Sequence, residues 1–182
     1  MASALFFPDT TVVSNFALIG QMQLLEDMVN GNGAWCATVA SECAAGSALP
    51  GLGDMAKAGG IFGSPIYPDA AEHVDILVLQ DHMRQPGDLA TAHLGEAETI
   101  TIIARRGLNA AFVTDDTDAR RQASAHGIPV YSTWHILKLA VATKALTMAD
   151  FFVAYYVLVA AKRGHPPCAR EKSAVSTWLT TN

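Results

Sequence analysis

Four carboxylates lie close together in the sequence between Gly95 and Asp116, in a chain of which only 16% of the residues are charged. Glu96 and Glu98 open a predicted helix, and Asp115 and Asp116 follow the next predicted strand. Clustered carboxylates repel one another unless a positive group lies between them, and a divalent cation is the usual solution. The pattern therefore predicts a metal site.

Two further acids are placed where such a site could recruit them. Asp9 follows a short apolar run, and Glu42 lies on a predicted helix that is otherwise nearly uncharged. Carboxylate oxygens without paired histidines or cysteines suit Mg²⁺ or Mn²⁺ better than zinc. Because these ions polarise phosphoryl oxygens and activate water, the predicted reaction is hydrolysis of a phosphodiester.

The predicted elements would bring these acids to one edge of a sheet. Asp9 and the pair Asp115 and Asp116 stand at the carboxyl ends of two predicted strands, and Glu96 begins the helix between them. Ligands of open parallel sheets bind at that edge, and a helix N-terminus favours carboxylates. We expect three separate elements to converge on one acidic pocket.

Alternating strands and helices predict a three-layer α/β/α domain around a central, mostly parallel sheet. The predicted strands are 4–7, 110–113 and 128–131, and the predicted helices are 11–19, 22–28, 36–48, 96–106, 117–126, 133–145 and 147–163. Residues 46–68 are rich in glycine and proline, which predicts a long and mobile loop. Residues 73–83 fit either a helix or a strand.

The composition predicts a single domain over residues 1–182, with a core of about 4–145 and a helical extension over 146–182. A net charge of −5 argues against a broadly basic nucleic-acid surface but is compatible with an acidic nuclease site. Cys36 and Cys43 lie about 10 Å apart along a predicted helix, too far to form a disulfide. Sparse cysteines, the lack of a basic leader and the shortness of the apolar stretch Phe151–Ala161 predict a cytoplasmic protein that does not enter a membrane.

Several segments together resemble the PIN domain family. Residues 7–20 read FPDTTVVSNFALIG and are similar to the opening of a PIN domain. The later segments GEAE (95–98), TDDTDAR (114–120) and GIPV (127–130) are similar to its later motifs, most closely in the branch near VapC-like toxins. The resemblance covers residues 4–145, and the match is poor over 46–88.

This resemblance implies a Mg²⁺- or Mn²⁺-dependent ribonuclease acting on RNA, often a homodimer and often the toxin paired with an antitoxin protein. By position, it implies four catalytic acids, with Thr114 supporting the metal or its water: Asp9, Glu42, Glu96 and Asp116. The residues that it implies as metal ligands are Asp9, Glu96, Glu98, Asp115 and Asp116.

Alternatives remain open from the sequence alone. Residues i and i+2 of a helix point about 160° apart, and neighbours at a strand end point to opposite sides, so either member of each acidic pair could face the metal. Asp9 could simply cap the following helix, and Glu42 could be a solvated surface residue. The second functional hypothesis is a catalytically inactive PIN fold that serves as a binding or regulatory module.

Overall fold

The centre of the protein is a parallel sheet of three short strands, seen in a computed structural model that describes residues 4–167 and 171–181. The strands are β1 (Leu5–Pro8), β2 (Ala110–Val113) and β3 (Val130–Tyr131), in the order β1-β2-β3. Phe6 pairs with Ala111 and Val113 pairs with Tyr131, so all three carboxyl ends lie at the same edge. The residues that follow the strands therefore meet there.

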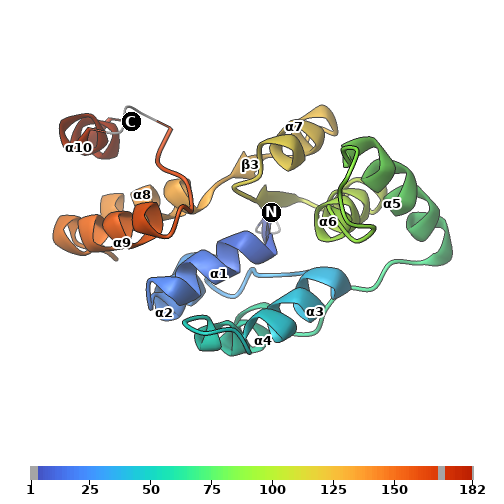
Figure 1. Ribbon diagram of the computed structural model, residues 1–182, viewed down its shortest axis with the longest axis horizontal. Helices are drawn as coiled ribbons and strands as arrows, with labels where there is room; N and C mark the ends of the chain where they lie inside the picture. The colour runs from blue at the N-terminus through green and yellow to red at the C-terminus, as the bar shows by residue number, and fades with distance from the viewer. Residues whose placement is uncertain (1–3, 168–170, 182) are drawn as a thin grey trace.

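Helices cover both faces of this sheet (Figure 1). Phe7 and Phe112 pack into an apolar cluster with α5 (Ala70–Met83), α6 (Leu94–Arg105) and α7 (Thr117–Ala125). Phe6 and Val113 point the other way, because side chains alternate along a strand. They pack into the cluster formed by α1 (Thr10–Leu18), α2 (Met22–Val29), α3 (Ala37–Gly46), α8 (Thr133–Ala142) and α9 (Met148–Ala160). The predicted three-layer α/β/α fold is confirmed.

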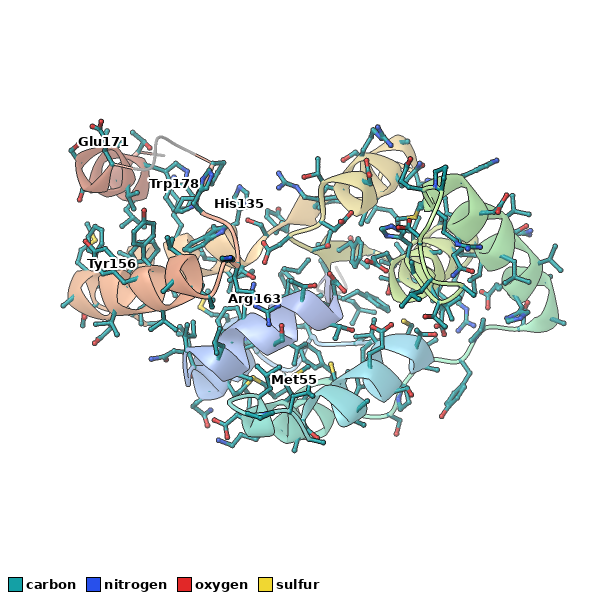
Figure 2. The ribbon with its side chains drawn as sticks, in the orientation of Figure 1. Met55, His135, Tyr156, Arg163, Glu171 and Trp178 are labelled. Carbon is teal, nitrogen blue, oxygen red and sulfur yellow. The ribbon has the colours of Figure 1, made fainter. Side chains whose placement is uncertain are left out.

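The prediction of a long loop over residues 46–68 is wrong at its centre. The segment forms a 3₁₀ turn, η1 (Gly53–Lys57), and a short helix, α4 (Ala58–Phe62), whose residues Met55 and Phe62 are buried. Figure 2 shows Met55 between α1 and the layer formed by α3 and α4. Glycines interrupt the apolar spacing on which a sequence prediction depends, so η1 and α4 carry no clear local signal. Burial of their side chains against neighbouring helices stabilises them.

The ambiguous segment 73–83 belongs to α5, a single helix. Asp69 caps it, since its side chain accepts hydrogen bonds from the backbone N–H groups of Ala71 and Glu72, both at 2.8 Å. Glu72 in turn forms an ion pair with Arg106, at 2.6 Å from its Nη2, which ties α5 to the end of α6. The capping residue settles the choice that the apolar spacing left open.

A last helix, α10 (Lys172–Thr180), follows the individually predicted helices, within the segment 146–182 where a helical extension is expected, and it packs on α8. Its residues Val175 and Leu179 are buried in the same apolar cluster as Phe151 and Leu158 of α9. The two C-terminal helices thus extend one core instead of forming a second one. Over the described part of the chain, no helix combines the length and apolar character needed to cross a bilayer.

Candidate metal centre

Asp9 lies at the point where β1 ends and α1 begins. Its backbone N–H donates to the carbonyl oxygen of Val113 at 2.8 Å, which continues the pairing of β1 with β2 beyond the strand. Asp9 holds the N-cap position of α1, but its side chain makes no capping hydrogen bond there. The side chain is 4% exposed, because the ends of both strands and the first turn of α1 surround it.

Thr114 links Asp9 to Asp116 across the ends of β1 and β2. The buried hydroxyl Oγ1 of Thr114 donates to Oδ2 of Asp9 at 3.2 Å and accepts from the backbone N–H of Asp116 at 3.1 Å. Asp116 caps α7, and its Oδ1 accepts from the backbone N–H of Ala119 at 2.7 Å. This places the predicted supporting threonine between two of the predicted acids.

Glu42 and Glu96 enter from two helices that pack against each other. Glu42 lies on α3 and accepts a hydrogen bond from the Thr10 hydroxyl, immediately after Asp9 in the chain. Glu96 lies in the first turn of α6. Gly95 precedes it, and a Cβ added there would stand 3.4 Å from Oε2 of Glu42. The two helices therefore bring Glu42 close to the start of α6.

The electrostatics show that these four carboxylates act on one another. Burial, the charge of Glu96 and the charge of Glu42 raise the pKa of Asp9 to about 7, against the opposing hydrogen bond from Thr114. Burial raises the pKa of Glu96 too, and the charges of Asp116 and Glu42 add to that rise. None of the four forms a salt bridge with a lysine or arginine whose side chain the structure describes. Burial and mutual repulsion therefore disfavour the charged forms of Asp9 and Glu96, and no described lysine or arginine relieves that repulsion.

The structure separates the two members of each acidic pair. Glu98 is buried on the other side of α6, where its Oε2 accepts from the backbone N–H of Thr38 at 3.1 Å. Asp115 turns away from Asp116 and accepts from the backbone N–H of Thr133 at 3.0 Å and from Nδ2 of Asn15 at 2.9 Å. Of the residues predicted as metal ligands, Glu98 and Asp115 thus accept hydrogen bonds from neighbouring helices.

Sequence reasoning missed two side chains beside the cluster. Thr10 holds Glu42, and the only signal was its position next to Asp9. His93 is not among the predicted site residues, yet its Nδ1 lies 3.7 Å from Oε1 of Glu96. His93 has a left-handed backbone conformation with φ of 60° just before α6, and no spacing of histidines in the sequence marks it.

The donor set fits a hard divalent cation. Within the described ranges, no three Asp, Glu, His or Cys side chains are gathered closely enough to enclose an ion by themselves. Mg²⁺ is usually bound through one or two carboxylates and keeps several waters, so a closed protein cage is not required. The observation that supports a cation is the group of mutually repelling carboxyl groups around the buried side chain of Asp9.

Comparison with known families identifies the fold around this cluster. The family model DUF3368, described as a PIN domain, matches residues 6–152. The match spans β1 to the start of α9 and includes all four carboxylates. Comparisons with curated proteins and with solved structures gave no match. PIN domains are generally nucleases that use divalent metals. The chain belongs to the PIN domain family.

Proposed function

We propose that this chain is a Mg²⁺- or Mn²⁺-dependent endoribonuclease, with Asp9, Glu42, Glu96 and Asp116 as its acidic residues. One observation carries the proposal: four carboxylates from separate elements act on one another around a buried Asp9 whose pKa is about 7. Such repulsion costs stability in the metal-free fold, whereas a bound cation would relieve it. Membership of the PIN family supports the same reading.

The chain's own residues hold these carboxylates in place. Thr114 fixes Asp9, Thr10 fixes Glu42, and the first turn of α7 fixes Asp116 through its backbone N–H. A bound Mg²⁺ or Mn²⁺ would polarise a phosphoryl oxygen and activate water for attack. Burial and the neighbouring carboxylates raise the pKa of Asp9, and a carboxyl group must lose its proton to hold a cation, so we expect cation binding to strengthen as the pH rises.

The proposal extends to the biological setting that the family resemblance implies. We propose RNA as the substrate, the cytoplasm as the location, and a homodimer as the assembled form. We also propose that the chain acts as a toxin neutralised by an antitoxin protein. A short gene directly upstream, encoding a DNA-binding head and an amphipathic tail, would support this role.

Cleavage of single-stranded RNA tests the proposed activity directly. A pool of labelled RNAs is incubated with Mg²⁺, with Mn²⁺ and with EDTA, and a matched DNA pool is run in parallel. We expect cleavage of RNA with either metal, no cleavage with EDTA, and a loss of about 100-fold or more in Asp9→Asn and Asp116→Asn. Asp118→Asn is the matched control, because Asp118 also lies on α7 but pairs with Arg121 at 3.0 Å on the surface.

Two results would overturn the proposal. Cleavage that is unchanged in Asp9→Asn would remove the acidic cluster from the reaction. Wild-type protein that is folded by circular dichroism, yet neither cleaves RNA nor binds Mn²⁺ in a calorimetric titration, would be the inactive binding module.

A further inference from the structure

We propose that Glu98 is a positioning residue, which clamps the N-terminus of α3 to α6 and thereby holds Glu42 beside Glu96. The proposal rests on the function proposed above, because it assigns Glu98 a role in building that site rather than in binding the cation. Its evidence is the geometry at the crossing of the two helices.

The N-terminus of α3 lacks a capping side chain of its own. Its N-cap residue is Cys36, which makes no side-chain capping hydrogen bond. Glu98 supplies the missing acceptor from α6, since its Oε2 accepts from the backbone N–H of Thr38 at 3.1 Å. A carboxylate is well suited to this position, because the free N–H groups at a helix N-terminus carry partial positive charge.

Cys36 strengthens the same crossing. Its Sγ lies 3.6 Å from the carbonyl oxygen of Gly95, to which the thiol donates, and 3.3 Å from Oγ1 of Thr99. Burial and the charge of Glu98 raise the pKa of the Cys36 thiol to about 12, so the thiol keeps its proton and remains a donor. The carboxylate of Glu98 therefore faces Cys36 and Thr38, on the opposite side of α6 from Glu96.

Gly95 allows the two helices to approach closely at the next turn. A Cβ added at Gly95 would lie 3.1 Å from Cγ2 of Val39 and 3.4 Å from Oε2 of Glu42, tighter than or at the limit of ordinary contact. The same Cβ would lie 3.7 Å from Cγ2 of Thr38. The contact surface thus runs from Thr38, which Glu98 holds, to Glu42, one helical turn further along α3.

The geometry explains why the sequence contains both Glu96 and Glu98. Residues i and i+4 of a helix lie on the same face, so fixing Thr38 fixes the direction in which Glu42 points. Glu96 faces the acidic cluster, and Glu98 faces α3, the helix that carries Glu42. In the described structure, Oε1 of Glu98 is buried without a hydrogen-bond partner, and Oε2 makes the contact with Thr38.

Two substitutions of Glu98 separate a clamp from a ligand. Glu98→Gln keeps an oxygen that can accept from Thr38, whereas Glu98→Ala removes it. In metal-free protein, hydrogen exchange of the Thr38 amide should be about tenfold faster in Glu98→Ala and nearly unchanged in Glu98→Gln. Glu26→Ala is the control, since Glu26 is exposed on α2 and far along the chain from this crossing.

Calorimetric titration with Mn²⁺ then tests the consequence for the site. We expect Glu98→Ala to weaken Mn²⁺ binding about tenfold, with Glu98→Gln within about threefold of wild type. In a Glu42→Gln background, Glu98→Ala should weaken binding by less than about twofold, because Glu42 is the residue through which the clamp acts.

Any result that differs from these expectations contradicts the proposed role of Glu98. Equal losses in Glu98→Gln and Glu98→Ala would mean that the charge of Glu98 binds the cation directly. An unchanged Thr38 exchange rate, or the same loss of Mn²⁺ affinity with and without Glu42, would mean that Glu98 does not act through α3. If wild type binds no Mn²⁺, the proposed function fails by itself, and the Thr38 exchange rate still decides whether the clamp exists.

Discussion

At the scale of single residues, the burial of Asp9 beside other carboxyl groups costs stability in the metal-free fold. Its carboxyl is buried beside two other carboxylates, so its pKa lies near 7 instead of the usual 3.8. The folded protein without metal therefore binds a proton at Asp9 over a pH range in which the unfolded chain has already lost it. By linkage, proton binding at Asp9 stabilises the metal-free fold. This contribution to the free energy of unfolding is complete below about pH 4 and is lost as the pH rises through 7.

Asp9→Asn should remove that penalty. Asparagine keeps the shape and an oxygen that can accept from Thr114, but it carries no charge. In EDTA at pH 8, we expect Asp9→Asn to be more stable than wild type by about 2 kcal/mol, and the difference should shrink towards pH 5. Urea unfolding at pH 5, 6, 7 and 8 measures it. A difference that does not change with pH would contradict the assignment of the raised pKa to Asp9.

At the scale of elements, the acids that are turned away from the cluster hold the framework together. Asp115, at the end of β2, accepts from both the backbone N–H and the hydroxyl of Thr133, the latter at 2.5 Å, at the start of α8. It also accepts from Asn15 of α1. Burial raises the pKa of Asp115, and these hydrogen bonds oppose the rise. One carboxylate thus joins a strand to two helices, as Glu98 joins α6 to α3.

Asp115→Ala should therefore be costly even without any role in chemistry. It removes the acceptor of the Thr133 backbone N–H and hydroxyl and one of the two acceptors of Asn15 Nδ2, which we expect to lower the free energy of unfolding by about 2–4 kcal/mol. Asp118→Ala, which breaks only a surface ion pair with Arg121, should change it by less than about 0.5 kcal/mol. Thermal and urea unfolding compare the two variants. Similar small losses in both would show that Asp115 does not tie these elements together.

At the scale of the whole molecule, segments outside the sheet complete one core. The segment 53–62 closes the side of the domain formed by α1 and α3, and the ring of its Phe62 lies 5.5 Å from that of Trp35. In the C-terminal part of the chain, α10 places Trp178 beside His135 of α8, with ring centroids 6.4 Å apart (Figure 2). Both segments bury apolar side chains: Met55 and Phe62 in the first, and Val175 and Leu179 in the second.

Phe62→Ala tests whether the segment 53–62 belongs to the core. Phe62 is 4% exposed, so we expect its truncation to cost about 3–5 kcal/mol of unfolding free energy. Leu49→Ala, in the same glycine-rich stretch but at a side chain 57% exposed, should cost less than about 0.5 kcal/mol. If both variants unfold at the same urea concentration as wild type, the segment is not part of the cooperative core.

The sequence by itself determined the strands, the order of the major helices and the set of acids. One short apolar run is followed by Asp9, and another is followed by Thr114 and then by Asp115 and Asp116. Such runs predict strands with carboxylates just beyond their ends, and this prediction needs only local sequence. β2 begins and ends at its predicted residues, Ala110 and Val113. The long helices agree to within a few residues at each end, because their apolar spacing and caps are also local signals.

Only the tertiary structure decided which acid of each pair faces the cluster. Glu96 and Glu98 are equivalent as a sequence pattern, and so are Asp115 and Asp116. The choice depends on the rotation of α6 against α3 and on the direction in which β2 ends, and both are set by packing between segments far apart in the chain. The sequence pattern does not mark Thr38 or Thr133. Their backbone N–H groups donate the hydrogen bonds that orient Glu98 and Asp115 away from the cluster. The physical reason is that a hydrogen-bonding partner is a neighbour in space, which local spacing does not encode.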